Sequence, residues 1–325
     1  MNHYLGIEIG GTKLQIGVGA DDGVLAGLWR GGVDAAAGPE GIRRQIAGAV
    51  PELLAKANID RSQLQGVGIG FGGPVDDATR TVIKSHQIEG WDGFPLADWV
   101  SDVVGLPAVL GNDADVAGLA EALHGAAKGL SPIFYITIGS GIGGGFIIDG
   151  EIYRGVGKGA AEFGHLRIAD SGLGEDVAIL PLENQASGWS IAENAKTLQL
   201  IGFDLGEFQR LGGGKPLTAE AVARIAEQGG LSAQGILEQA WEALAEGICH
   251  VIVLLCPRRI VIGGGVSLMG EKILFEPLRR MVAERVFKPF TDCYDIVAAA
   301  LGEEVVVHGA IALAHRKLGP REGAG

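Results

Sequence analysis

The sequence predicts an α/β protein of two domains. The chain has 325 residues, 47% of them hydrophobic, which is enough for two domains of ordinary size or for one large one. Short apolar runs typical of strands alternate with longer runs of helical spacing. Two glycine-rich hairpins about a domain apart repeat one design, a strand, a glycine turn beside a threonine and a second strand. Because no low-complexity linker divides the halves, we expect the domains to share a cleft.

The first half is predicted to open with three strands and a helix, and to continue with two more strands and a second helix. The helix that follows the last of these strands has Asn112 or Asp113 as its N-cap. The expected strands cover residues 5–9, 14–18, 24–29, 65–70 and 109–113. The expected helices cover residues 39–57 and 114–126.

The second half begins with the second glycine hairpin and then becomes mainly helical. Residues 154–176 are polar and rich in glycine without a helical period, and long irregular segments are often functional. The expected strands cover residues 134–138, 146–148 and 259–262. The expected helices cover residues 182–198, 219–227, 233–255, 269–286 and 304–317, and we expect residues 319–325 to be disordered.

Charge and cysteine content exclude several classes of partner. The net charge of −13 and the pI near 5.0 argue against a nucleic-acid surface, which needs clustered Lys and Arg. The longest apolar run, residues 248–256, is far shorter than a membrane span of roughly 20 residues, so we interpret it as the buried end of a helix. Cys249, Cys256 and Cys293 form no CxxC pattern and read as buried apolar residues. Their odd number, without a secretory leader, predicts a reducing, cytoplasmic location.

The glycine hairpins predict a phosphate site. Bare backbone N–H groups in such turns form concave anion sites, and glycine lets a phosphate approach without a Cβ in the way. One such turn would be weak support, because glycine pairs also make ordinary hairpins. Two threonine-bearing turns, near residues 10–13 and 137–141, predict one polyphosphate gripped from both sides. A third turn, at residues 263–265, could let a flat base lie against the backbone.

Several polar residues could carry chemistry, although each has a plain structural alternative. Asp113 follows a strand and opens a helix, the place where open α/β sheets hold ligands, so it could deprotonate a hydroxyl or simply help Asn112 to cap the helix. Glu162 and His165 lie in the irregular passage and could be surface residues. Glu183 opens a predicted helix, where an acid favours the dipole. The residues alone leave these alternatives open.

Taken in order, the motifs resemble those of the ROK family of sugar kinases and sugar-responsive repressors. The likeness covers nearly the whole chain and rests on Gly-Ile-Glu-Ile-Gly-Gly-Thr-Lys, Gly-Gly-Pro-Val-Asp, Gly-Asn-Asp-Ala-Asp, Ile-Thr-Ile-Gly-Ser-Gly-Ile-Gly-Gly-Gly, Glu-Phe-Gly-His and Ile-Gly-Gly-Gly-Val-Ser. It implies the two-domain actin-like ATPase fold, also called ribonuclease H-like, with ATP and sugar meeting in a central cleft. The smaller domain would comprise residues 1–111 plus 304–325, and the larger one residues 112–303.

The resemblance also implies ATP and Mg²⁺ as cofactors and assigns residues to them and to the sugar. Asp113 matches the catalytic base of the family, which would accept the proton of the C6 hydroxyl of a hexose. Positioning of that hydroxyl in line with the γ-phosphate, and neutralisation of charge by Mg²⁺, would carry most of the remaining catalysis. The sugar ligands would be Gly73, Asn112, Asp113, Glu162, His165 and Glu183. The nucleotide would be held by Gly10, Gly11, Thr12, Lys13, Thr137, Gly139, Gly141, Gly264 and Gly265.

Three departures from the family pattern stand out. Glu8 replaces the usual Asp that faces Mg²⁺ through water, and Gly72 replaces a proline, which we expect to loosen the chain before the sugar. The family's zinc knot is missing, because Gly174, Asp176 and Pro181 stand where its three cysteines would be. We therefore predict no zinc, and we expect apolar packing of Val177, Ile179 and Leu180 to hold that loop instead.

The sequence thus favours an ATP-dependent hexose kinase, with glucose ahead of N-acetylmannosamine, fructose and allose. One alternative is a sugar-sensing regulator of the same family, but such repressors carry a helix-turn-helix domain first, whereas here the first hairpin starts near residue 5. Another is a nucleotide-binding protein without catalysis, which would not need Asp113. The resemblance favours a homodimer, and neither nucleic acid nor membrane is expected as a partner.

Overall fold

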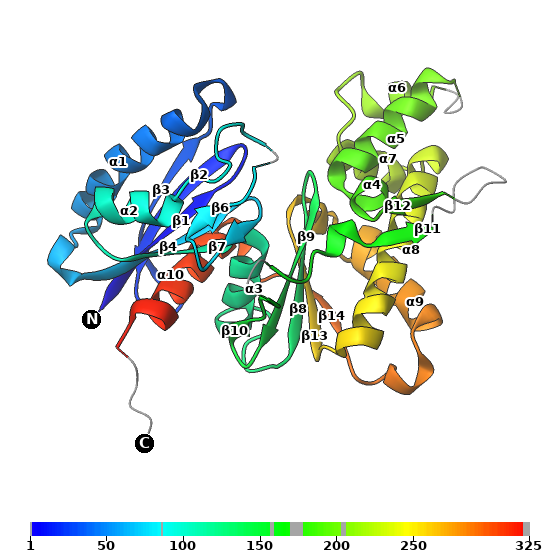
Figure 1. The fold of residues 1–325 in the computed structure, drawn as a ribbon. Coiled ribbons are helices and arrows are strands. Elements are labelled where there is room, and N and C mark those ends of the chain that lie inside the picture. Colours follow the sequence, from blue (N-terminus) through cyan, green and yellow to red (C-terminus); the bar gives the residue numbers. More distant parts are fainter. Residues whose placement is uncertain (1, 86, 157–158, 170–177, 203–205, 321–325) are drawn as a thin grey trace. The chain divides into compact units, whose positions relative to one another are not determined.

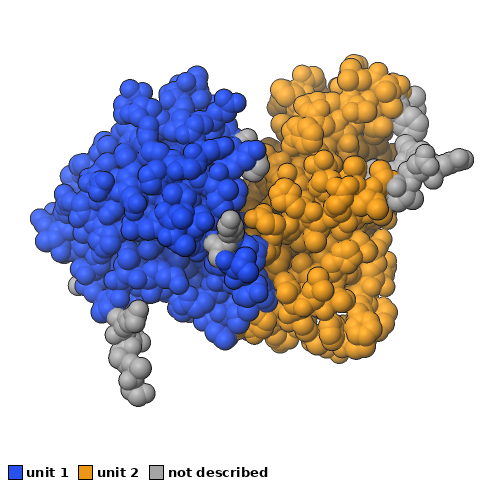
Figure 2. All heavy atoms as spheres, viewed as in Figure 1, with its two compact units in different colours: residues 1–130, 145–160, 300–325 blue, residues 131–144, 161–299 orange. Residues whose placement is uncertain are grey.

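The computed structural model describes residues 2–85, 87–156, 159–169, 178–202 and 206–320 (Figure 1). The chain divides into two compact units (Figure 2). Unit 1 comprises residues 1–130, 145–160 and 300–325, and unit 2 comprises residues 131–144 and 161–299. Among the residues described, no helix combines the length and the apolar character needed to cross a membrane.

Unit 1 is built on a five-stranded sheet in the order β3-β2-β1-β4-β7. Strand β2 is antiparallel to both β1 and β3, whereas β4 runs parallel to β1 and β7 parallel to β4. The strands are β1 His3–Ile9, β2 Lys13–Gly19, β3 Leu25–Gly32, β4 Leu64–Phe71 and β7 Ala108–Asn112. The helices are α1 Gly38–Ala57, α2 Leu96–Val104, α3 Asp113–Leu123 and α10 Val305–Leu318, and the short strands are β5 Val75–Asp76, β6 Thr81–Val82 and β10 Glu151–Ile152.

Glycines let α10 pack directly on the backbone of its neighbours in unit 1. A Cβ added to Gly68 of β4 would lie 1.8 Å from the carbonyl oxygen of Ala310, and one added to Gly309 would lie 1.9 Å from that of Val116 in α3. Real Cβ atoms do not make such contacts, so these two positions require glycine at the helix–sheet and helix–helix approaches. The C-terminal helix is thereby fixed to the unit that contains the first glycine hairpin.

The second five-stranded sheet has the order β10-β9-β8-β13-β14, with β13 parallel to both β8 and β14. Its further strands are β8 Ile133–Ile138, β9 Ile142–Ile148, β13 Arg259–Gly263 and β14 Ile296–Ala298. The helices of unit 2 are α4 Glu183–Ala186, α5 Gly188–Leu200, α6 Glu207–Gly212, α7 Ala219–Glu227, α8 Leu231–Leu255 and α9 Glu276–Arg285. A separate two-stranded antiparallel sheet joins β11 Arg167–Ala169 to β12 Ile179–Pro181.

The α/β class and both predicted hairpins are confirmed, whereas several helices differ from the expected ones and some short elements were not expected. The helix expected over residues 182–198 is split at Ser187. The backbone of Ser187 is extended, and its Oγ caps α5 by accepting a hydrogen bond from the N–H of Ser190. The helix expected over residues 269–286 begins as a π-helical turn over 271–275, followed by α9. The helix expected over 114–126 ends at Leu123. Residues 321–325 of the tail lie outside the described part of the chain.

Two expectations about burial were wrong in part. The apolar run at the end of α8 is not buried throughout, because Val253 is 52% and Leu254 76% exposed on the face of the helix that turns away from the core. Cys249 is buried, and burial raises the pKa of its thiol to about 11, but Cys256 and Cys293 are only half-buried.

The units also divide at a different place from the expected domains. The expected boundary between residues 111 and 112 falls inside unit 1, which continues to residue 130. Helix α3 belongs to unit 1 because it packs on α10, and its fully buried Glu121 accepts hydrogen bonds from the N–H groups of Ala300 and Leu301, both at 2.9 Å. A charged group so deeply buried needs these partners, so the start of the C-terminal segment is tied to α3.

Candidate active site

The first glycine turn joins β1 to β2 in unit 1. It is closed by a hydrogen bond of 3.0 Å from the N–H of Gly10 to the carbonyl of Lys13, and Thr12 at its tip is exposed. The side chain of Gln87 lies over the turn, since a Cβ at Gly11 would be 1.8 Å from its Oε1. The four predicted nucleotide ligands of this unit are therefore gathered in one exposed turn.

Glu8 stands at the base of this turn and is only 5% exposed. Its Oε1 lies 3.0 Å from Nζ of Lys13, and its Oε2 accepts a hydrogen bond of 3.0 Å from Nε2 of Gln15. Burial raises the pKa of the Glu8 carboxyl above its usual value; Lys13 opposes this effect, and the negative charge of Asp113 adds to it. Glu8 and Asp113 are thus close enough in space for their charges to interact.

Asn112 and Asp113 lie at the junction of β7 and α3. Asn112 caps α3, because its Oδ1 accepts from the N–H groups of Ala114 and Asp115, and its Nδ2 donates to the carbonyl of Gly73 at 3.0 Å. The capping alternative is correct for Asn112. The hydrogen bond from Asn112 to Gly73 also links α3 to the glycine turn after β4. It lies at the carboxyl ends of parallel strands, where such sheets hold ligands.

The Asp113 carboxylate faces the glycine turn that follows β4. A Cβ at Gly72 would lie 3.5 Å from Oδ2 of Asp113 and 3.7 Å from Cα of Gly10. The N–H of Gly72 donates to the carbonyl of Ile9 at 2.9 Å, a bond that a proline at this position could not make. The substitution that we expected to loosen the chain therefore adds a tie between β4 and β1. Within unit 1 the structure brings Asp113, Gly73 and the first glycine turn together.

The second glycine turn lies between β8 and β9 in unit 2 and is braced by Glu183. The N–H of Ile142 donates to Oε2 of Glu183 at 2.8 Å, and a Cβ at Gly141 would lie 2.3 Å from that oxygen. The N–H of Gly188 donates to the carbonyl of Gly139 at 2.8 Å, so the start of α5 also rests on the turn. Glu183 therefore lies beside the predicted phosphate turn and does more than open a helix.

Glu162 and His165 flank a short 3-10 turn in the same unit. Both side chains are exposed, whereas Phe163 and Gly164 between them are buried, and Phe163 packs on Phe134 of β8. A Cβ at Gly164 would lie 2.2 Å from the carbonyl oxygen of Ile142, the residue whose N–H is bound by Glu183. The structure thus brings the turn with Glu162 and His165, and the side chain of Glu183, to the start of β9.

The triglycine turn after β13 also borders the second glycine turn. Gly264 has φ +84°, and its Cβ would lie 2.6 Å from the carbonyl oxygen of Ile138, so glycine is required there. A Cβ at Gly265 would meet no atom within 4 Å. The space that a side chain at Gly265 would occupy is therefore open.

The residues in place of the zinc knot do not fit a zinc ion. Pro181 ends β12 and offers no ligand atom, and neither does a glycine such as Gly174. Gly174, Asp176 and Val177 lie outside the described residues. Among the residues that are described, no three or more His, Cys, Asp or Glu side chains are grouped so that they could hold a metal ion.

A glutamine amide, which sequence reasoning missed, holds this region in the structure. Nε2 of Gln185 donates to the carbonyls of Ile168 in β11 and Leu180 in β12, at 2.9 and 3.2 Å. The expected apolar packing is wrong for Ile179, which is 55% exposed because it alternates outward on β12. We name the two strands together with Gln185 the Gln185 staple. Its two strands lie between His165 and Glu183 in the chain, and Gln185 follows Glu183.

The chain is similar to known proteins over nearly its whole length. The family described as the ROK family matches residues 4–317. The glucokinase of Thermotoga maritima is 29% identical over 97% of this chain and 98% of its own, and that of Streptomyces coelicolor is 32% identical over 97% and 98%.

A solved structure shows the same fold. The ROK family glucokinase of Streptomyces griseus, in complex with glucose and AMPPNP, superposes with a TM-score of 0.78 at 31% identity, over 97% of this chain and 100% of that one. The actin-like α/β fold predicted from the motifs is confirmed. The chain belongs to the ROK family.

Proposed function

We propose that this protein transfers the γ-phosphate of ATP to a hexose, most favourably to the C6 hydroxyl of glucose, with Asp113 as the general base. The observation that carries the proposal is the position of Asp113, whose carboxylate lies at the carboxyl end of β7 against Gly72 and next to the first glycine turn. A base must lie within reach of both the hydroxyl and the phosphate site. The glucokinases among its relatives support glucose as the first substrate to test.

In this proposal the two glycine turns hold the phosphates through their backbone N–H groups. Gly10, Gly11, Thr12 and Lys13 serve from unit 1, and Thr137, Gly139 and Gly141 from unit 2. Gly264 and Gly265 accommodate the adenosine. Because phosphoryl transfer needs little covalent help from the protein, holding the hydroxyl in line with the γ-phosphate carries most of the rate enhancement.

Glu8 is the proposed contact to Mg²⁺, through water. A carboxylate oxygen is the kind of ligand that Mg²⁺ takes in proteins, and the ion usually keeps several waters. Both oxygens of Glu8 already have partners in Lys13 and Gln15, which favours contact through water over direct ligation. When bound, the ion would neutralise charge on the β- and γ-phosphates.

The proposed sugar ligands have distinct tasks. Asn112 and Gly73 are linked to each other, so they can present a fixed amide and backbone to the sugar. Glu162 and His165 are exposed on a turn whose core is buried, which holds them in place while leaving them accessible. Glu183 receives the N–H of Ile142 and could couple the sugar to the second glycine turn.

A coupled assay of ADP formation across glucose, mannose, fructose, allose and N-acetylhexosamines tests the proposal. We expect ADP release that depends on one or a few sugars, with glucose the best, and a 6-phosphorylated product. Tight sugar binding without ADP release would favour the alternative of a sugar-sensing regulator. ATP binding with neither sugar binding nor turnover would favour a non-catalytic nucleotide-binding protein.

We also propose that the protein is a homodimer in the cytoplasm. Sedimentation analysis tests the mass expected of the dimer.

A further inference from the structure

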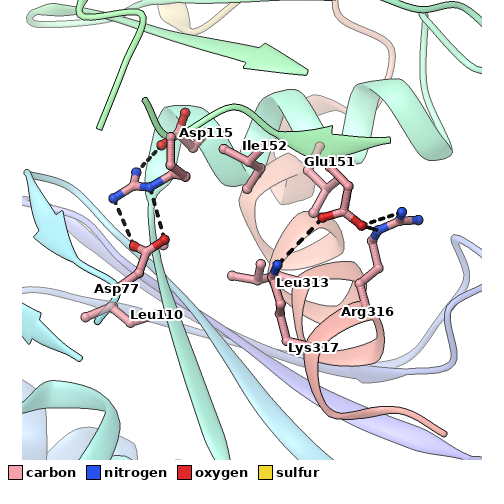
Figure 3. Close-up of a pocket in the computed structure, with 11 residues that line it drawn as sticks. Asp77, Leu110, Asp115, Glu151, Ile152, Leu313, Arg316 and Lys317 are labelled. Carbon is pink, nitrogen blue, oxygen red and sulfur yellow. Dashed lines mark hydrogen bonds and ion pairs between the residues drawn. The ribbon is translucent and has the colours of Figure 1, made fainter. Parts of the chain in front are cut away.

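Arg154 stands beside the candidate active site of unit 1 and no part of the proposed chemistry uses it. It follows β10, and its side chain is only 14% exposed. It lines a pocket of about 50 Å³ together with Asp77, Asp115, Glu151 and Arg316 (Figure 3). Such a volume holds a few water molecules at most, so the pocket is too small for a sugar or a nucleotide.

The Arg154 guanidinium connects two segments through three groups. Its Nη1 donates to Oδ2 of Asp115, in the first turn of α3. Its Nε and Nη2 bind the two carboxylate oxygens of Asp77 at 3.1 and 2.9 Å, and Nη2 also donates to the carbonyl of Val75 at 3.0 Å. In Figure 3, Asp77 and Asp115 lie on one side of the pocket, with Glu151 and Arg316 on the other.

These partners flank the proposed catalytic residues. Asp115 is two residues from Asp113, and Val75 is two residues from Gly73. The side chain of Asp115 is only 3% exposed, so its charge is compensated inside the protein by the guanidinium. The bond between Asn112 and Gly73 links the same two segments at a second point. The parallel ladder of β4 and β7, in which Phe71 pairs with Asn112, is a third link, and together the three links fix the orientation of the two segments.

We propose that Arg154 is a positioning residue that holds the start of α3, with Asp113, in register with the glycine turn that carries Gly73. This role rests on the proposed function, because it supposes that Asp113 is the base and that Gly73 faces the sugar. Arginine suits the task because its planar fork can bind two carboxylates and a carbonyl at fixed angles, whereas lysine offers a single point charge.

The test compares Arg154→Met and Arg154→Lys with the wild type and with Arg316→Met. Arg316 binds Glu151 on the other side of the same pocket, so it is a matched control. We expect kcat for glucose to fall about 10- to 100-fold in Arg154→Met, because displacement of a reacting group by about 1 Å can cost that much. The KM for ATP should stay within about twofold. Arg154→Lys should recover part of the loss, and Arg316→Met should match the wild type.

A double variant separates positioning from folding. Arg154→Met leaves the Asp115 carboxylate buried without its cation, and Arg154→Met/Asp115→Asn removes that charge. We expect the double variant to melt close to the wild type but to keep the low kcat, because the bridge to Asp77 and Val75 is still absent. Recovery of kcat together with melting temperature, or wild-type kcat in a folded Arg154→Met, would overturn the positioning role. A wild-type enzyme without sugar-dependent turnover would contradict the proposed function itself and, with it, the role given to Arg154.

Discussion

The Gln185 staple should hold its two strands together without a metal, and replacing its amide tests this directly. Gln185→Met keeps the length and shape of the side chain but removes the donor to the carbonyls of Ile168 and Leu180. A neutral hydrogen bond contributes about 0.5–1.5 kcal/mol net, so loss of both should cost about 1–3 kcal/mol of local stability. If the strands open locally, their amides should exchange about 5- to 150-fold faster.

Hydrogen–deuterium exchange followed by mass spectrometry gives this measurement for peptides covering β11 and β12. Gln234→Met is the matched control, because Nε2 of Gln234 also donates to a backbone carbonyl, that of Ala226 at 3.0 Å, away from the staple. The KM for the sugar should rise in Gln185→Met, since His165 precedes β11 and Glu183 follows β12. Unchanged exchange in β11 and β12, or the same change in the control, would refute the staple.

Three further predictions concern metal, charge and packing. Elemental analysis of the purified protein should find no stoichiometric zinc, and a chelator should not lower its melting temperature. One tightly bound equivalent of zinc would contradict the conclusion that the residues in place of the zinc knot do not fit this ion. The pKa of Glu8 is raised in the folded state, so ionisation of Glu8 costs stability as the pH rises above the ordinary pKa of a glutamate. The melting temperature of Glu8→Gln, measured relative to that of the wild type, should therefore increase from pH 4 to pH 7.5. A difference that does not change with pH would refute this. Gly68→Ala should lower stability by at least about 2 kcal/mol in denaturant unfolding, because its Cβ would meet the Ala310 carbonyl; wild-type stability would contradict the packing.

Local sequence patterns predicted much of the fold. The two hairpins follow from apolar runs around glycine turns, and the bounds of β1, β8 and α7 differ from the expected ones by at most two residues. Helix α2 was not expected, although its buried residues Leu96, Val100 and Val104 have helical spacing, because Pro95 before it offers no capping side chain to mark its start. Ser187 was assigned to the interior of a helix, since its role as a cap depends on an extended backbone that the apolar spacing does not reveal.

The sequence predicted those parts of the candidate site that lie within single short motifs. Asn112, Asp113 and the glycine turns can be found from short motifs, each with a local physical reason. The bond from Ile142 to Glu183 spans 41 residues, and that from Arg154 to Asp77 spans 77. Such pairs become visible only when the fold brings distant segments together. The contacts of Arg154 and Gln185 follow from no local motif, which is why sequence reasoning missed their roles.

The central claim is that Asp113 is the general base of a sugar kinase, and turnover of Asp113→Asn beside the wild type tests it most directly. The asparagine keeps the size of the side chain and can still accept the bond from the N–H of Ala114. Calorimetry should therefore find sugar affinity largely retained. The account predicts that kcat falls by roughly 10²–10⁴, the usual contribution of a positioned general base. Turnover near that of the wild type, in a variant that binds sugar and ATP, would contradict it.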